Sequence, residues 1–428
     1  MSGCAPAHGS ASLVRRLLKL GLLTLVLASC GGGDGGNDGG TSVNPPSTGG
    51  NPPQNPPPPT PAPVPAFQTP YPYVDVLHNM MEFDPTRGLL YAYVAPGDRT
   101  HPKSFAIIDV ATQAVQYTGP FDFVPWQMRV SQDGKYLYVA TANTREVVRL
   151  TLPGFAVDIR FGLGVDPTTI NGTNGQPFDA GDIVVSPQDS RRIVVSLFHL
   201  DYHVCAMGLR MYSDATTVAE LFQNDVNGPG LGDGLTIDPA GRLVTVCTGG
   251  TPDIVTRVSQ DNDTLTILDT GRGVSGQSNS IQATDIAILS GTGGKWDMPQ
   301  FTLRGYLPPL TLDPFDDTAP PLYGCVFADD VGAVAACISQ VSTDSPVSLP
   351  TFRTFVLYEL TNANSFGYVP LDLAANNHVS KIIRLGTGQF AVSVGPSTDS
   401  VFFLSAFQYL QQNTRIYFLS GISTTYPP

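Results

Sequence analysis

The segment from residue 199 to residue 205 holds the side chains best suited to bind a metal ion. It reads His199-Leu-Asp201-Tyr-His203-Val-Cys205, so four ligand types occur at every second position. In an extended strand alternate residues share one face, which would bring the four side chains together. Zinc accepts imidazole, carboxylate and thiolate ligands. The competing interpretation, which we favour, is a polar-edged turn with two ordinary histidines, and we therefore expect no metal or other cofactor.

Clusters of aspartate suggest calcium binding as a second kind of metal chemistry. Carboxylates are good Ca²⁺ ligands, but no cluster completes a D-x-[DN]-x-[DN]-G loop with a distal Glu. Aspartate is also a common turn residue without any metal, and we interpret these residues as turns. The clusters are Asp313, Asp316 and Asp317; Asp329 and Asp330; and Asp261 and Asp263.

The sequence offers no recognisable catalytic set. It contains no G-x-S-x-G nucleophile elbow and no phosphate-binding loop. The histidines that follow His8 do not recur at one position of the repeat described below. They are His78, His101, His199, His203 and His378.

Two disulfides are predicted in the part of the chain that follows residue 66. The segment LYGCVFADDVGAVAACIS reads as a hairpin whose turn places Gly332 in the left-handed conformation. Counting outward from that turn, 327 faces 335 and Cys325 faces Cys337. Facing residues lie near disulfide reach. The remaining pair is Cys205–Cys247; free buried thiols are the alternative.

These residues must be positioned by a repeating β-structure. An apolar residue, a polar turn often carrying Asp and Gly, and an alternating apolar strand recur at a mean spacing of about 50 residues, as in propeller blades. The copies are FDPTRGLLYAYV at 83, VSQDGKYLYVAT at 130, VSPQDSRRIVVSL at 185, IDPAGRLVTVCT at 237, LSGTGGKWDM at 289, VFADDVGAVAACIS at 326 and RLGTGQFAVSV at 384.

A second hairpin follows most copies, which predicts four antiparallel strands per repeat. The expected fold is therefore all-β, a seven-bladed β-propeller with almost no helix. The fifth copy is short, so the count is open by one blade, and a pair of β-sandwiches is the competing architecture. The second hairpins are IIDVATQAVQY (107–117), LTLPGFAVDI (150–159), MYSDATTVAEL (211–221), VSQDNDTLTIL (258–268) and YELTNANSFGYV (358–369).

At VSQDGKYLYVATANTREVVRLTL (130–152) the chain resembles the YVTN and lactonase-like seven-bladed propellers. Each blade of that family has an S-P-D-G-K-x-L-Y-V-A core. The match is close in this copy and partial in three or four others, and it covers most of residues 80–405. The resemblance implies the propeller fold. It also raises lactonase-type hydrolysis as a hypothesis, which would need acid and base residues converging at the axial mouth.

The N-terminus predicts export and lipidation. A basic segment with Arg15, Arg16 and Lys19 precedes the apolar run Leu20–Leu27, which is too short to span a bilayer and reads as a signal peptide. It ends Leu-Ala-Ser-Cys30, which resembles the bacterial lipobox. We expect residues 1–29 to be the signal peptide, 30–66 a lipid-anchored Gly/Pro-rich disordered linker, and 67–428 the propeller, in the bacterial cell envelope as an outer-membrane lipoprotein.

Three functional hypotheses are compatible with this organisation. The favoured one is a non-catalytic binding or scaffold domain with a protein or glycan partner; the others are a lactonase-like hydrolase and an outer-membrane assembly factor. The net charge of −13 disfavours nucleic acid as a partner, because an acidic surface repels phosphates. The longest predicted insertions, where binding is expected on a rigid scaffold, are 164–181, 222–233 and 297–321.

Overall fold

The computed structural model of the chain forms two compact units, Met1–Pro65 and Ala66–Pro428, and all described residues belong to the second. The predicted signal peptide, Cys30 and the linker to residue 66 therefore lie outside the described residues. The described ranges are 71–142, 144–167, 175–199, 207–222, 231–232, 234–247, 254–272, 281–284, 287–290, 294–298, 302–307, 323–340, 353–360, 364–371, 377–396 and 413–424.

The described residues form antiparallel sheets of consecutive strands. The first contains β1 (Tyr73–Asp84), β2 (Leu89–Val94), β3 (Phe105–Asp109) and β4 (Val115–Tyr117). The second contains β5 (Pro125–Val130), β6 (Tyr136–Thr141), β7 (Glu146–Thr151) and β8 (Ala156–Gly162). The third contains β9 (Asp179–Val185), β10 (Arg192–Phe198), β11 (Gly208–Ser213) and β12 (Thr216–Phe222). The fourth contains β13 (Gly234–Ile237), β14 (Leu243–Cys247), β15 (Ile254–Ser259) and β16 (Thr266–Arg272).

The remaining strands continue the same order. The fifth sheet contains β17 (Ile281–Ala283), β18 (Ala287–Ser290), β19 (Gly294–Asp297) and β20 (Thr302–Tyr306). The sixth contains β21 (Tyr323–Phe327), β22 (Val334–Gln340), β23 (Arg353–Glu359) and β24 (Asn364–Leu371). Three strands, β25 (Asn377–Gly386), β26 (Gln389–Pro396) and β27 (Asn413–Leu419), join the first sheet through β1. The helix in the described part is the single 3-10 turn η2 (Asp261–Asp263).

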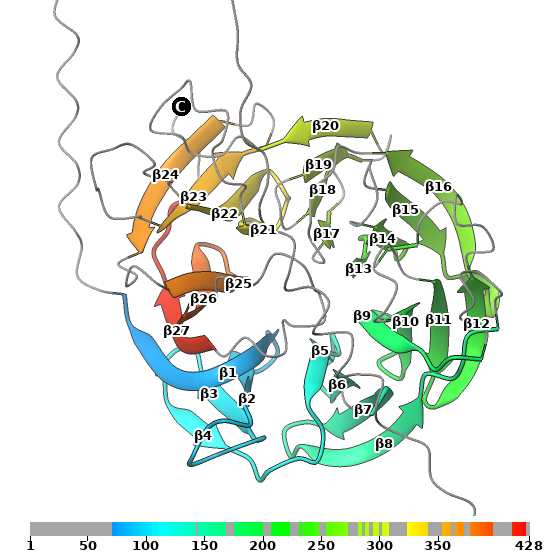
Figure 1. Cartoon of the computed structure of the whole chain (residues 1–428). Coiled ribbons are helices and arrows are strands. Elements are labelled where there is room, and N and C mark those ends of the chain that lie inside the picture. Colours follow the sequence, from blue (N-terminus) through cyan, green and yellow to red (C-terminus); the bar gives the residue numbers. More distant parts are fainter. Residues whose placement is uncertain are drawn as a thin grey trace, which may run out of the picture. The chain divides into compact units, whose positions relative to one another are not determined.

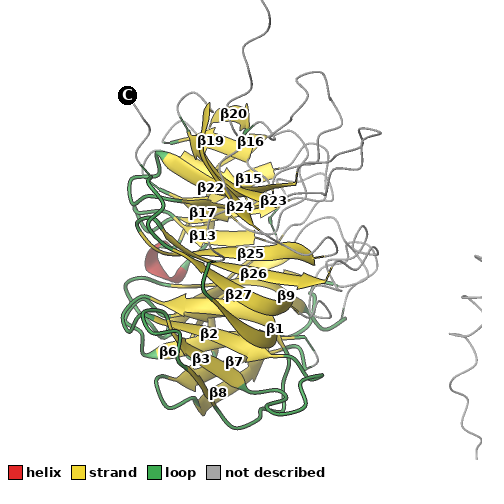
Figure 2. Cartoon of the chain, turned by 90° about the vertical axis from the view of Figure 1, so that its left-hand side faces the viewer, coloured by secondary structure: helices red, strands yellow, loops and turns green. Residues whose placement is uncertain are grey.

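The sheets stand around a common axis, with β5, β9, β13, β17, β21 and β25 nearest to it and β8, β12 and β16 at the rim (Figure 1). Because the strands alternate in direction, the turns between first and second strands and between third and fourth strands share one face of the ring, the turn face. The connections from one sheet to the next share the opposite face, the connection face. Figure 2 shows the strands running between these two faces.

The second and third strands are buried on both faces, as a sheet packed between two others requires. In β2 and β6 every residue after the first is buried. Their side chains fill apolar layers between neighbouring sheets; one such layer places Tyr91 and Tyr93 of the first sheet against Leu137 and Val139 of the second. This explains why the repeat reads as an apolar run and not as a strict alternation.

The outermost strands carry a recurring β-bulge. One residue of the fourth strand falls outside the pairing register with the third strand in five sheets. A bulge bends and twists an edge strand, which hinders another chain from pairing with it. The bulged residues are Asp158, Val218, Leu268, Arg304 and Gly367.

The aspartates that begin the turns bind the backbone of those turns. One carboxylate oxygen of Asp329 accepts hydrogen bonds from the N–H groups of Gly332, Ala333 and Val334 at 2.9, 3.0 and 3.2 Å. Asp84 likewise accepts the N–H of Thr86 at 2.9 Å. Asp329 is thus a turn residue, as the sequence suggested.

Strand β1 joins the end of the propeller to its beginning. Its first residues pair with β27, Tyr73 with Tyr417 and Asp75 with Arg415, while Met81 to Asp84 pair with β2. The side chains support this closure, because the Arg415 guanidinium lies 4.5 Å from the Tyr73 ring centre and donates to Asp75 at 2.8 Å. The terminal strand therefore completes the sheet that β25, β26 and β27 begin.

Two sequence interpretations need correction. Six of the seven repeat copies form the hairpin between first and second strands, but the fifth, at 289, forms the hairpin between β18 and β19. A pattern of apolar residue, Gly-rich turn and strand does not tell one hairpin of a sheet from the next. The predicted insertion 297–321 contains strand β20, whose Thr302 and Leu303 pair with β19. Its prolines lie outside that strand and obscured it.

Candidate functional site

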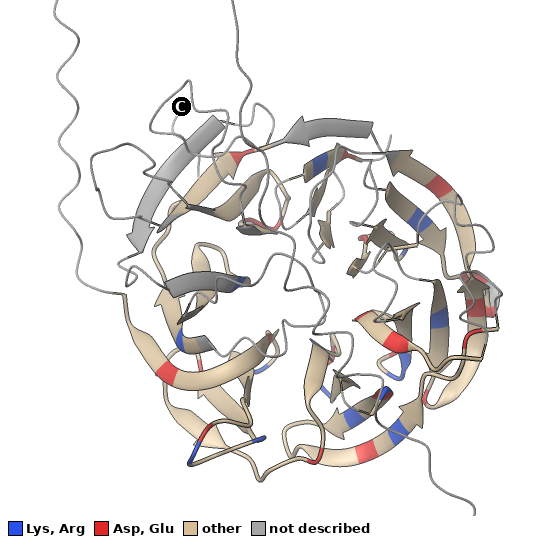
Figure 3. Cartoon of the chain, in the orientation of Figure 1, with Lys and Arg blue, Asp and Glu red and all other residues tan. Residues whose placement is uncertain are grey.

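Four charged side chains from successive innermost strands form a chain around the axis. They are Lys381 on β25, Glu82 on β1, Arg129 on β5 and Asp182 on β9, and their signs alternate. Arg129 Nη2 lies 2.8 Å from Asp182 Oδ1, and Glu82 Oε2 lies 3.8 Å from Arg129 and 3.9 Å from Lys381. Figure 3 shows charged positions on inner strands such as β9 as well as on outer strands such as β8. We call these four residues the charged arc.

Asp182 is the best-buried member of the charged arc, with 1% of its side chain exposed. Arg129 donates from one guanidinium nitrogen to both carboxylate oxygens, at 2.8 and 3.0 Å. The backbone N–H of Ile183 donates to Oδ1 at 2.8 Å, and that of Leu235, on β13 of the next sheet, donates to Oδ2 at 3.0 Å. The carboxylate therefore links three sheets.

For Asp182 and Lys381, loss of water sets the direction of the pKa shift. Burial raises the pKa of Asp182 above its ordinary value, and the attraction of Arg129 opposes this. Burial lowers the pKa of Lys381, and the attraction of Glu82 opposes this. The Lys381 ammonium also donates to the carbonyl of Met81 at 2.9 Å, so its proton is held by the neighbouring sheet.

These contacts provide hydrogen-bond partners for backbone groups that the sheets leave unpaired. The innermost strand of each sheet has one edge that pairs with no strand, and its backbone groups need other partners. Side chains of neighbouring inner strands supply them: Asp182 accepts from Leu235, and Gln282 Oε1 accepts from the N–H of Phe327 at 2.8 Å. The axial polar residues thus join inner strands and satisfy their backbone, which is a structural task.

The fold also brings a serine to a histidine that is remote in sequence. His78 Nε2 lies 2.8 Å from Ser393 Oγ, and His78 Nδ1 lies 2.7 Å from the carbonyl of Val76. A serine hydroxyl beside an imidazole is the start of a nucleophile–base pair. However, His78 and Ser393 are 0% and 1% exposed, and burial lowers the pKa of His78 to about 4. The pair lies where β1 passes between sheets, and it packs that junction out of reach of a substrate.

His199 has a carboxylate partner in the structure. His199 Nε2 lies 3.1 Å from Asp166 Oδ2, and the imidazole stacks on Phe178 with ring centres 5.1 Å apart. Asp201, His203 and Cys205 lie outside the described residues. Among the described residues no group of three or more His, Cys, Asp or Glu is placed to hold a metal ion. Of the other aspartate candidates, Asp263 pairs with Arg192 at 2.7 Å, and Asp313, Asp316 and Asp317 lie outside the described residues.

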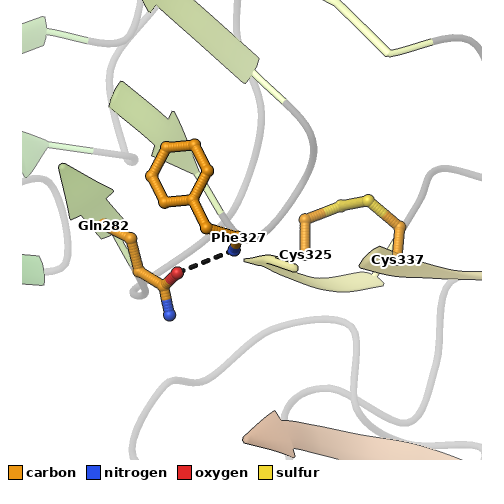
Figure 4. The surroundings of a disulfide bond; sticks show 4 residues. All are labelled: Gln282, Cys325, Phe327 and Cys337. Atoms are coloured by element: carbon orange, nitrogen blue, oxygen red, sulfur yellow. Dashed lines mark hydrogen bonds between the residues drawn. A yellow bond between two sulfur atoms is a disulfide. The ribbon is translucent and has the colours of Figure 1, made fainter. Parts of the chain in front are cut away.

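The predicted Cys325–Cys337 disulfide is present, with Cα atoms 4.2 Å apart (Figure 4). The register is the expected one, because Phe327 pairs with Ala335, and Gly332 has φ +75°. Figure 4 also shows Gln282 reaching from β17 to the N–H of Phe327, so the bridge lies beside a contact between sheets. Cys247 is disulfide-bonded as well. Its predicted partner Cys205 lies outside the described residues, so that pairing stays a prediction.

Sequence reasoning missed the charged arc and the His78–Ser393 pair. A signal for part of the arc exists, since Glu82 and Arg129 each immediately precede the apolar residue that begins a repeat copy. Asp182 precedes its copy by three residues, so alignment of the repeats does not align the charges. No local pattern links His78 to Ser393, because their contact depends on closure of the ring.

Comparison with known proteins supports the fold alone. No family model matches the sequence, and no curated protein matches it. Among the described residues no helix is long and apolar enough to cross a membrane. The β-propeller domain of Myceliophteria thermophila Cps50 (Swd1) is similar with a TM-score of 0.54 at 11% identity, over 81% of this chain and 98% of that one. The C-terminal WD40 domain of Sif2 has a TM-score of 0.47 at 12% identity, over 79% and 80%. With its four-stranded antiparallel sheets and the likeness to the Cps50 domain, the described part of the chain is a β-propeller.

Proposed function

We propose that the propeller is a non-catalytic binding or scaffold domain for another macromolecule. The observation that carries this proposal is the commitment of the axial polar side chains to contacts between sheets. Asp182 is bonded to Arg129, Ile183 and Leu235, and Lys381 is bonded to Met81. A propeller whose axial groups hold the ring together leaves its faces and rim for recognition.

We also propose that the ring has seven blades. Six sheets contribute four consecutive strands, and β25, β26 and β27 with the first residues of β1 make a further group of four. Contacts between inner strands run from β1 through β5, β9 and β13 to β17, and from β21 through β25 back to β1. The step between β17 and β21 is made by β18 and by the Gln282–Phe327 hydrogen bond. An experimental density map with six or eight sheets around the axis would contradict this count.

The same proposal includes the anchor. We expect cleavage after Ser29 and acylation of Cys30, with the linker 30–66 holding the propeller in the cell envelope as an outer-membrane lipoprotein. The chain enters the propeller at the turn face, where the Phe418 N–H donates to the carbonyl of Pro72 at 2.9 Å. The predicted insertions 164–181 and 222–233 follow β8 and β12, whose ends lie at the connection face, and 297–321 extends past the end of β20 at the same face. This arrangement favours the connection face for partners.

One experiment tests both the class of function and the face. A photo-crosslinking residue replaces either Arg99, in the β2–β3 loop at the connection face, or Lys135, in the β5–β6 turn at the turn face. Each variant is the full chain, expressed in its host. We expect a discrete crosslinked complex from position 99 and none from position 135, and no hydrolysis of lactones or esters by the purified chain. Turnover of a simple lactone that is abolished by Glu82→Gln would instead establish the lactonase-like hydrolase. Crosslinks to outer-membrane assembly components would point to the assembly factor, a special case of the scaffold.

A further inference from the structure

An aromatic pair, one exposed ring and one partly buried ring, lies at the outer edge of the first sheet. Tyr117 ends β4, and His101 belongs to the connection between β2 and β3. Their rings stack in parallel, with centres 3.7 Å apart and planes 2° apart. Tyr117 is 37% exposed, one of few large hydrophobic side chains to face solvent to this extent in the described part of the chain. Its stacking on His101 gives the surface an aromatic area larger than one ring.

The pair is rigid before any ligand arrives. Asp98 Oδ1 accepts hydrogen bonds from the N–H groups of Thr100 and His101, both at 2.7 Å, and the Ser104 hydroxyl donates to the His101 carbonyl at 2.8 Å. Burial, with a smaller contribution from the Asp98 charge, raises the pKa of Tyr117. Its hydroxyl therefore stays protonated at neutral pH and can donate. A preorganised site loses little conformational entropy on binding.

Charged groups adjoin the aromatic pair. The Phe121 N–H donates to the carbonyl of Lys103, which joins the segment after β4 to the connection that holds His101. Arg160 donates through both terminal nitrogens to Asp122, at 3.0 Å for Nη1. These hydrogen bonds, with a lesser contribution from Lys103, hold the pKa of Asp122 below its usual range. The neighbourhood thus offers solvent-facing donors and acceptors on fixed backbone.

We propose that this patch, defined as His101, Tyr117, Lys103, Asp122 and Arg160, binds a neutral oligosaccharide. A sugar ring has an apolar C–H face that suits an aromatic ring and a hydroxyl edge that suits paired carboxylate and guanidinium groups. Binding of this kind needs an open platform and not an enclosed pocket. The inference deepens the proposed binding function by naming a ligand class, and it rests on that function.

Other ligand classes fit the patch less well. Nucleic-acid bases also stack on aromatic rings, but they require a positively charged groove, and the chain carries a net charge of −13. A protein partner buries about 800 Å² on each side, far more than two aromatic rings provide. A neutral sugar needs neither a basic groove nor a large area.

The test is titration of the full chain in detergent with two uncharged probes, N-acetyl-chitohexaose and cellohexaose, by calorimetry. Tyr117→Ala and His101→Ala each remove one ring of the stack, and we expect each to weaken binding at least about tenfold. Leu268→Ala is the matched control, because Leu268 is 49% exposed on another outer strand and lies outside the patch. It should leave the affinity unchanged, and all three variants should keep the thermal midpoint of the parent.

Each result decides the proposal. Binding of either probe that depends on both rings supports it. Binding that survives both substitutions places the sugar elsewhere and overturns it, as does an absence of binding of both probes at millimolar concentration. If Tyr117→Ala lowers the thermal midpoint, Tyr117→Leu and His101→Gln, which remove the rings but keep side-chain bulk, replace the two alanine variants. The crosslinking experiment above is independent, so a failure here leaves the scaffold proposal standing.

Discussion

Between β25 and β13 the innermost strands are linked by the charged arc, whereas between β17 and β22 the described links are uncharged or covalent. In the first region Lys381, Glu82, Arg129 and Asp182 reach from strand to strand. In the second, which we call the neutral arc, Gln282 binds the Phe327 backbone and Cys325 is bridged to Cys337. Unpaired backbone groups are thus met by a charged acceptor in one region and by a neutral amide in the other, where the disulfide adds a covalent link within one sheet. Each region should therefore fail under a different stress.

The largest effect is expected in the charged arc, from Asp182→Ala. It removes the partner of Arg129 and leaves the N–H groups of Ile183 and Leu235 without their acceptor. Loss of one member of a buried ion pair costs about 3 kcal/mol or more, because the remaining charge stays desolvated. Urea unfolding should show this loss. Asp182→Asn keeps an acceptor and should cost less than the alanine variant.

A double-mutant cycle separates the pair from its surroundings. Arg129→Ala should destabilise less than Asp182→Ala, since Arg129 is 26% exposed and Asp182 serves more partners. The double variant should recover part of the summed loss, because no unpaired charge remains. Additive losses would mean that the two side chains act separately and that the charged arc is not one network.

The neutral arc should depend on its covalent link. Replacing both Cys325 and Cys337 by Ala removes a cross-link over a short loop, which the chain-entropy model values at about 3 kcal/mol. This loss should be insensitive to salt, whereas the Arg129–Asp182 contribution should shrink as salt rises. Equal salt dependence of the two contributions in urea unfolding would remove the distinction between the arcs.

Acid should destabilise the folded chain at the junction where β1 closes the ring. The pKa of His78 is about 4 in the folded chain against an ordinary value of 6.5. Between these pH values the unfolded chain binds a proton that the folded chain does not, so stability falls as the pH drops from 6.5 to 4. The full shift corresponds to about 3 kcal/mol. His78→Gln should flatten this part of the pH profile of urea unfolding, and an unchanged slope would refute the role of His78.

The sequence predicted those features of the fold that a local pattern of residues determines. Repeat spacing and turn residues gave the four-stranded sheets, and counting outward from Gly332 gave the Cys325–Cys337 pair, because hairpin register is fixed by its own turn. The charged arc could not be found this way. Asp182 and Glu82 stand at different heights on their strands, and they share a network only because ring closure brings their strands around one axis. The Asp166 partner of His199 was out of reach for a similar reason, since it comes from a connection 33 residues away; the metal hypothesis for residues 199–205 stays a hypothesis.

The smallest expected effect comes from Gly332, in the β21–β22 turn, which packs against Thr284 in the β17–β18 turn; Gly88, in the β1–β2 turn, serves as the control. Gly332 and Gly88 both occupy the left-handed region, with φ +75° and +66°. A side chain in that region costs roughly 1 kcal/mol at either position. A Cβ at Gly88 would meet nothing within 4 Å, but one at Gly332 would lie 2.3 Å from Thr284 Oγ1. Gly332→Ala should therefore destabilise more than Gly88→Ala in urea unfolding, by about 1 kcal/mol.

The Thr284 side chain decides whether that difference reflects contact between sheets. Its hydroxyl is already bonded within the β17–β18 turn, where the Ala287 N–H donates to it at 3.2 Å, so turning it aside sacrifices a hydrogen bond. In a Thr284→Gly background Gly332→Ala should cost no more than Gly88→Ala, because the Thr284 oxygen, methyl group and Cβ, all within 3.0 Å of the new Cβ, are gone. A gap that persists in that background would show that the strain lies within the β21–β22 turn itself. The neutral arc would then be held by the Gln282–Phe327 hydrogen bond and the disulfide, with no stabilising contact between its turns.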